Sequence, residues 1–96
     1  MTSSGKVTSG TAKVLMYLTA ACPFCQSAER LLAEKGVCDI EKIRVDQQPG
    51  RRAEMMQKSG RRTVPQIWIG ERHVGGCDDL YALEREGKLD PLLKLA

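Results

Sequence analysis

Two cysteines three residues apart, Cys22 and Cys25, have the clearest capacity for chemistry in this sequence. They lie in the stretch YLTAACPFCQSAERLLAEKG, where an apolar run gives way to a helical pattern. A pair with this spacing can be half of a metal site, a structural disulfide or a reactive dithiol. Features elsewhere in the sequence distinguish among these three interpretations.

Metal binding and a disulfide scaffold are both poorly supported. A structural zinc site takes four ligands, usually from two close pairs of cysteine or histidine. Cys38, Cys77 and His73 are scattered along the chain, so the sequence supplies a single close pair. Four cysteines in 96 residues without an export signal are too few for a disulfide scaffold. We therefore expect no metal ligands and favour the reactive dithiol.

The elements around the pair give this interpretation a mechanism. Residues 13–19 form an apolar run typical of a buried strand, and a helix is expected from Pro23, at its first turn, to a stop at Gly36. Cys22 then lies at the helix N-terminus, whose free N–H groups and dipole favour a thiolate. Cys25 lies one turn into the helix. We expect Cys22 to attack and Cys25 to resolve the resulting disulfide.

The remaining pattern predicts a small α/β domain in the order β-α-β-α-β-β-α. A helix between the first two strands implies a parallel, right-handed crossover, and a later hairpin adds an antiparallel pair. The result is a mixed four-stranded sheet flanked by helices. Residues 1–12 are expected to be a flexible extension, and 13–96 the folded domain. Further elements are expected at 39–45 (strand), 51–60 (helix), 64–70 and 72–76 (hairpin) and 78–86 (helix).

Two of these elements carry more specific expectations. In the helix over 51–60, Ala53 and Met56 are expected to face inward, with Gly60 ending the helix. Near the C-terminus, Asp90 is expected to cap a last short turn with Pro91 at its first position.

Two other motifs accompany the cysteine pair. In TVPQIWIG, a cis Val64–Pro65 bond would leave the Val64 backbone free for an extended ligand, although an ordinary strand-start proline is the plainer alternative. In GGCDDLYAL, two glycines precede a helix whose first turn carries Asp78 and Asp79. A helix N-terminus can bind an anion, but helix capping is the commoner role of such aspartates.

Together, CPFC, TVPQIWIG and GGCDDLYAL resemble the glutaredoxins in order and spacing, most closely the bacterial dithiol type. The resemblance extends from Lys13 to Leu95. It implies a thioredoxin fold and a glutathione-dependent thiol–disulfide oxidoreductase that reduces protein–glutathione mixed disulfides and protein disulfides. Cys22 is implied as nucleophile and Cys25 as its partner in a redox-active disulfide. The implied glutathione-binding residues are Thr19, Phe24, Arg52, Thr63, Val64, Pro65, Gly76, Cys77 and Asp78.

The resemblance also implies particular roles and partners. The Val64 backbone would pair with the glutathione cysteine, Asp78 would face the γ-glutamyl ammonium group, and Arg52 the glycyl carboxylate. Glutathione is the expected co-substrate, with no tightly bound cofactor. Expected clients are glutathionylated or disulfide-bonded proteins, including ribonucleotide reductase-like proteins, in electron transport and cell redox homeostasis. We expect a cytoplasmic monomer.

The chain departs from the family pattern at two positions. Phe24 stands where the usual C-P-Y-C motif has tyrosine, so the ring is kept and the phenol is lost. Thr19 stands three residues before Cys22, where a lysine is frequent. The missing ammonium group transfers stabilisation of the Cys22 thiolate to the helix terminus.

Composition excludes several other classes. The net charge is +3, and no apolar run is long enough for a membrane span. Residues 42–62 carry seven basic and two acidic side chains, but neither interleaved aromatics nor a nucleic-acid motif accompanies them. We expect no nucleic-acid or membrane partner, and we expect that this basic segment attracts the anionic tripeptide.

Two rival functions stay open. In one, two chains share an iron–sulfur cluster through Cys22 and two glutathiones; Pro23 disfavours this, because cluster-binding relatives more often have a small residue there. In the other, a flavoprotein rather than glutathione supplies electrons to a thioredoxin-like reductase. The GGCDD helix start favours glutathione.

Overall fold

One four-stranded sheet forms the centre of the computed structural model, which describes residues 12–37 and 39–94. Its strands are β1 (Val14–Leu18), β2 (Ile40–Arg44), β3 (Gln66–Ile69) and β4 (Arg72–Gly75). Their order in the sheet is β2-β1-β3-β4. β2 pairs with β1 in parallel, whereas β3 pairs antiparallel with both β1 and β4. The predicted mixed sheet is therefore confirmed.

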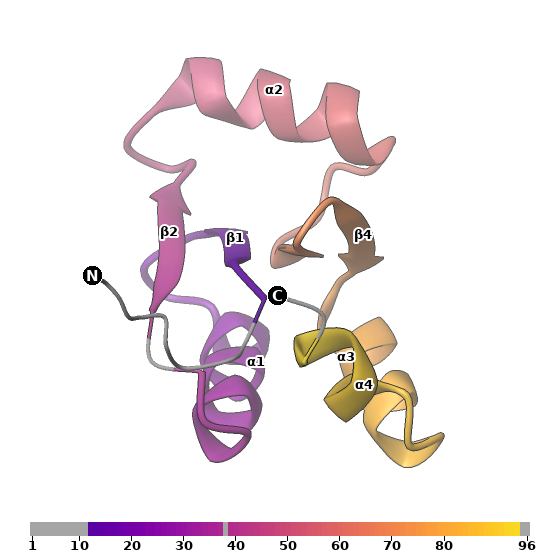
Figure 1. The fold of residues 1–96 in the computed structure, drawn as a ribbon. Coiled ribbons are helices and arrows are strands. Elements are labelled where there is room, and N and C mark those ends of the chain that lie inside the picture. Colours follow the sequence, from indigo (N-terminus) through magenta and orange to yellow (C-terminus); the bar gives the residue numbers. More distant parts are fainter. Residues whose placement is uncertain (1–11, 38, 95–96) are drawn as a thin grey trace, which may run out of the picture.

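The helices are α1 (Pro23–Glu34), α2 (Pro49–Ser59), α3 (Cys77–Arg85) and the short α4 (Leu89–Leu93). Figure 1 shows α2 on one side of the sheet, and α1, α3 and α4 on the other. The β-α-β-α-β-β-α order expected from the sequence is confirmed, with α4 as its last turn. This architecture is the expected thioredoxin fold.

Local sequence signals set the ends of the two central helices. Pro23 and Pro49 occupy the first helical turns of α1 and α2, where a missing N–H costs no helical hydrogen bond. Gly36 and Gly60 follow the helix ends with φ of 87° and 71°, a left-handed conformation that glycine adopts without steric penalty. A proline at the start and a glycine after the end thus set the bounds of both helices.

Buried side chains fill both faces of the sheet, because successive residues of a strand point to opposite faces. Met16 packs on the side of α1, α3 and α4, while its neighbour Tyr17 packs on the side of α2. The group beneath α2 consists of Tyr17, Ile43, Val45, Met55 and Trp68. The sheet is covered on both faces, so the functional groups have to lie at its ends.

The prediction for the inward face of α2 was wrong. Met55 is fully buried, whereas Ala53 and Met56 are exposed. The hydroxyl of Tyr17 bonds to Glu54 and accepts from Lys58 Nζ at 3.2 Å, so polar side chains of α2 also face the sheet. The apolar residues of α2 alone therefore do not predict which of its faces packs on the sheet, because Tyr17 requires polar partners from the helix.

The predicted cap of the last turn was also displaced. α4 begins at Leu89, with Lys88 in the cap position, and Asp90 lies inside the first turn. Leu89 is fully buried, and the helix that carries it into the core begins one residue before Asp90. The carboxylate of Asp90 instead pairs with Lys35 at 3.2 Å.

Ala12 is the first residue that the structure describes. This residue is buried, and its N–H donates to the carbonyl of Leu93. Residues 1–11 lie outside the described residues, so the predicted extension stays a prediction; Cys38 also lies outside them.

Candidate active site

Cys22 lies at the N-cap position of α1, directly after the loop that follows β1. Its backbone is extended, with φ −129° and ψ 104°, and its sulfur accepts a hydrogen bond from the Cys25 N–H at 3.2 Å. No acidic side chain occupies the first turn of α1. The unopposed helix terminus and this N–H both stabilise negative charge on the Cys22 sulfur.

Cys25 has a different environment, one turn further along α1. Its side chain is 1% exposed. Burial raises the pKa of Cys25 to about 12, with the neighbouring Cys22 sulfur as the next cause. Cys25 is therefore a neutral thiol at pH 7 while Cys22 is free.

The segment before β3 lies against the Cys22 sulfur. The Val64–Pro65 peptide bond is cis, as the TVP motif suggested. The carbonyl oxygen of Val64 is 4.0 Å from the Cys22 sulfur. This brings the two motifs together, although they are more than forty residues apart in the sequence.

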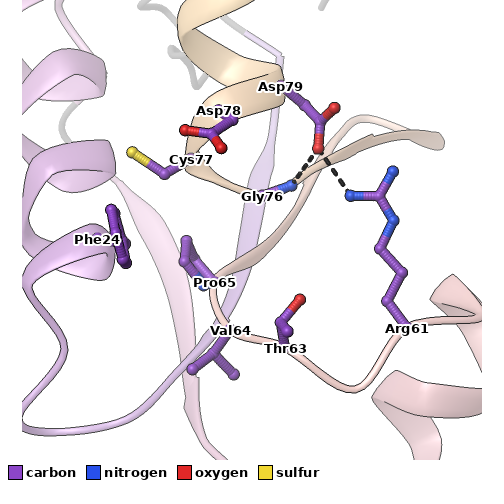
Figure 2. A pocket seen from close by; sticks show the side chains of 9 residues that line it. All are labelled: Phe24, Arg61, Thr63, Val64, Pro65, Gly76, Cys77, Asp78 and Asp79. Atoms are coloured by element: carbon purple, nitrogen blue, oxygen red, sulfur yellow. Dashed lines mark hydrogen bonds and ion pairs between the residues drawn. The ribbon is translucent and has the colours of Figure 1, made fainter.

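A cavity of about 300 Å³ opens beside these groups. Figure 2 shows Phe24 and Cys77 toward one side, Arg61 and Asp79 toward the other, and Pro65 between them. The cavity is lined by Phe24, Arg61, Thr63, Val64, Pro65, Gly76, Cys77, Asp78 and Asp79. Seven of the nine predicted glutathione-binding residues therefore share one cavity, with the Cys22 sulfur next to its Val64 wall.

Phe24 forms the apolar rim of this cavity. Its side chain is 62% exposed, an unusual state for a phenylalanine. It projects from the first turn of α1 toward the cavity (Figure 2). An exposed ring at this point offers apolar contact to a bound molecule.

Thr19 and Arg52 lie outside the lining of this cavity. Thr19 lies with Cys25 in a separate hollow, and its backbone hydrogen-bonds to Cys25. Arg52, in α2, donates from Nη2 to the Arg62 carbonyl at 3.4 Å. The structure brings Arg61, from the segment between α2 and β3, to the cavity instead.

Arg61 and Asp79 line the cavity, although neither was among the predicted glutathione-binding residues. The Asp79 carboxylate accepts from Arg61 Nη1 at 2.7 Å and from the Gly76 N–H at 2.9 Å. The Arg61 guanidinium, followed by this N–H, lowers the pKa of Asp79. A carboxylate three residues after a helix cap was a usable signal for Asp79, but nothing local distinguished Arg61 among the basic residues around it.

Gly75 makes the contact of Asp79 with Gly76 sterically feasible. Its φ is 117°, and a Cβ there would lie 2.3 Å from Asp79 Oδ2. A side chain at this position would displace the carboxylate as well as strain the backbone. The first glycine of the GG pair is therefore required at the start of α3.

Cys77 lines the cavity at the first residue of α3. Its side chain is 9% exposed, and burial, followed by the nearby Asp78 charge, raises the pKa of Cys77. Its position at a helix N-terminus is therefore not enough to activate it.

Other kinds of site are not evident in the described residues. Across 12–37 and 39–94, no three side chains of the types His, Cys, Asp or Glu are grouped to hold a metal ion. In the same part of the chain, no helix has the length and apolar character to cross a membrane.

Comparisons with known proteins agree on one family. A family model described as Glutaredoxin matches residues 14–74. A glutaredoxin of Pseudomonas aeruginosa is 61% identical over 80 residues, covering 83% of this chain and 94% of that protein. Glutaredoxin 3 of Escherichia coli is 51% identical over 83 residues, covering 86% and 99%.

A solved structure gives the same result. The crystal structure of a buckwheat glutaredoxin–glutathione complex superposes with a TM-score of 0.78 at 32% identity, covering 85% of this chain and 76% of that one.

Proposed function

This chain belongs to the glutaredoxin family, whose members are thiol–disulfide oxidoreductases, and we propose that it acts with glutathione as its co-substrate. Its reactions would be the reduction of protein–glutathione mixed disulfides and of protein disulfides. The observation that carries the proposal is the Cys22 sulfur at the N-cap of α1, beside a cavity lined by Val64 and Pro65.

The first step is attack by the Cys22 thiolate on the glutathione sulfur of a mixed disulfide. A new bond forms between Cys22 and glutathione, the old disulfide breaks, and the client leaves as a thiolate that takes a proton from water. A second glutathione thiolate then attacks the bound glutathione sulfur, which releases oxidised glutathione and restores the Cys22 thiolate. In the net reaction the client sulfur becomes a thiol, the second glutathione is oxidised from thiol to disulfide, and the two glutathiones leave joined as oxidised glutathione.

Cys25 would act when the client contains a protein disulfide. The Cys22 sulfur is itself a cause of the raised pKa of Cys25, through a hydrogen bond and through charge. Conversion of Cys22 into a mixed disulfide removes that charge, so the pKa of Cys25 falls. Cys25 then loses its proton more readily and can attack the Cys22 sulfur. The intramolecular disulfide is formed only after the first attack.

The cavity offers groups of suitable type for each end of glutathione. The Val64 N–H is available to an extended peptide, and Asp78 is an exposed carboxylate suited to the γ-glutamyl ammonium group. We assign the glycyl carboxylate to Arg61, in place of Arg52, because Arg61 lines the cavity. A guanidinium has five N–H donors, so the bond to Asp79 leaves others for a ligand.

The solved buckwheat relative was crystallised as a glutathione complex, which supports the same ligand here. The proposal also includes a cytosolic monomer that exchanges electrons between the glutathione pool and disulfide-containing proteins.

The test is a coupled assay with glutathione reductase and NADPH, using the mixed disulfide of glutathione and 2-mercaptoethanol. We expect turnover that requires glutathione. Cys25→Ser should retain this activity but lose the reduction of protein disulfides. Absence of turnover with glutathione, together with turnover when a flavoprotein disulfide reductase supplies the electrons, would refute the proposal in favour of a thioredoxin-like reductase.

A further inference from the structure

A buried amide lies directly behind the cavity. Gln66, the first residue of β3, has a side chain with 0% exposure and is the one buried polar side chain among the described residues. A buried amide is costly unless its donors and acceptor are paired. Here both ends are paired, so the side chain can adopt one orientation only.

The two ends of Gln66 join β4 to the cavity wall. Its Nε2 donates to the Thr63 carbonyl at 3.1 Å and lies 3.3 Å from Thr63 Oγ1. Its Oε1 lies 2.8 Å from His73 Nε2. Because Nε2 of the amide is the donor to Thr63, Oε1 must accept, and the proton of the neutral His73 ring is therefore on Nε2.

His73 is itself held in place. Its ring stacks on Trp68, its cross-strand neighbour, with centroids 4.6 Å apart. Trp68 belongs to the buried group beneath α2. A chain of contacts thus runs from this core through His73 and Gln66 to Thr63.

The Thr63 carbonyl shares a peptide group with the Val64 N–H. This peptide group is planar and trans, since the one cis bond in the described residues follows Val64. Its C=O and N–H therefore point in opposite directions. Anchoring the carbonyl on a buried amide directs the Val64 N–H away from that amide, toward the side open to a ligand.

The Val64 N–H has no hydrogen-bond acceptor in the described part of the chain, while the Val64 carbonyl lies beside the Cys22 sulfur. An N–H and a C=O presented by one residue are the groups with which an extended peptide pairs.

We propose that Gln66, tethered by His73, is a positioning residue that orients the Thr63–Val64 peptide for pairing with the substrate's peptide backbone. The proposal rests on the proposed function, because it assumes a peptide-containing substrate in the cavity. Neither side chain touches the reacting sulfur atoms. Their effect is to keep the peptide group in its binding orientation before the substrate arrives.

The first test compares Gln66→Met with the parent protein. Methionine has a similar length but makes none of these hydrogen bonds. We expect kcat/KM for the mixed disulfide of glutathione and 2-mercaptoethanol to fall by about tenfold, mainly through KM. Alkylation of Cys22 by iodoacetamide, measured with Cys25→Ser in the background, should stay within about twofold, because that reagent needs no backbone pairing.

His73→Phe provides a second, milder variant. It keeps the stack on Trp68 but removes the donor to Gln66, and we expect a loss of about threefold in kcat/KM. The double variant should lose no more than Gln66→Met alone, since His73 acts only through Gln66. Should Gln66→Met fail to fold, a loss of this size in His73→Phe, with unchanged alkylation, still supports the proposal.

Three results would overturn it: unchanged kcat/KM in the folded variants, equal losses in alkylation and turnover, or strictly additive effects of the two substitutions. Absence of turnover in the parent protein would instead refute the proposed function, so the two failures are distinguishable.

Discussion

Two helix N-termini meet at the cavity, and a cysteine lies at each of them. α1 begins after Cys22, with no acidic residue in its first turn. α3 begins at Cys77, with Asp78 and Asp79 in its first turn, and its cap is a glycine. The same element of backbone thus has opposite electrostatic surroundings at the two places.

The presence or absence of acidic residues in the first turn gives the two termini different functions. At α1, the N–H of Cys25 bonds to the Cys22 sulfur, an arrangement that would stabilise a thiolate at this position. At α3, burial and Asp78 raise the pKa of Cys77, while Asp79 accepts from the Gly76 N–H and from Arg61. We therefore expect the α1 terminus, and not the α3 terminus, to activate its thiol.

The largest expected effect comes from removing the cysteine at each terminus in turn. Cys22→Ser should lower turnover of the glutathione mixed disulfide by about 10³-fold or more, because the nucleophile is lost. Cys77→Ser should lower it by no more than about fivefold, because serine retains the backbone of α3. The coupled glutathione reductase assay measures both, and equal losses would end the distinction between the termini.

Next in size is the effect of Gly75→Ala on the α3 terminus. The new Cβ would approach Asp79 Oδ2 to 2.3 Å at a φ of 117°, and we expect a loss of about 2–3 kcal/mol in the free energy of unfolding. Gly50→Ala is the matched control in α2, where a Cβ would meet nothing within 4 Å. The control should be neutral or stabilising by up to about 1 kcal/mol. Urea unfolding measures both free energies. An unchanged free energy of unfolding in Gly75→Ala would show that the contact of Asp79 with Gly76 does not stabilise the fold.

A smaller effect separates the two arginines. Arg61→Gln should raise KM for the glutathione substrate by about three- to tenfold, since the cavity loses its cation. Arg52→Gln removes an equal charge from α2, outside the cavity lining, and should change KM by less than about twofold. If Arg52→Gln had the larger effect, the glycyl carboxylate would belong at the position first inferred from the family resemblance.

The smallest effect is on the acid limb of stability. Bonds from Arg61 and the Gly76 N–H lower the pKa of Asp79, so its stabilisation is complete above the ordinary aspartate value of about 3.9 and is lost as pH falls through the lower folded value. Asp79→Asn should therefore be less stable than the parent protein at pH 7, with the gap closing toward pH 2. Thermal unfolding across this range measures the gap, and a gap independent of pH would contradict the ionic role of Asp79.

The parts of the site that depend on neighbours in the sequence were predictable. Pro23 after Cys22 located the start of α1, and the TVP motif suggested the cis bond before Pro65, which the structure confirms. The order of strands and helices followed from periodicity together with Gly36 and Gly60 as stops.

The parts that depend on distant partners were not. Met55 rather than Met56 faces the sheet because polar side chains of α2 meet Tyr17, which is remote in sequence. Arg61 is chosen from several basic residues by its distance to Asp79. No partner for His73 could be predicted from the sequence, and its contact with Gln66 is made by the pairing of β3 with β4. These contacts depend on tertiary packing between residues distant in sequence, which a local sequence pattern does not predict.

The contrast between the two helix termini is tested most directly by the alkylation rates of the individual cysteines. The reduced protein, with Cys38→Ser in the background, is treated with iodoacetamide at pH 7, and each cysteine-containing peptide is quantified over time by mass spectrometry. We expect Cys22 to react at least about tenfold faster than Cys77 and Cys25, because only its sulfur lies at a helix terminus without an opposing carboxylate. Reaction of Cys77 or Cys25 at the rate of Cys22 or faster would contradict the account.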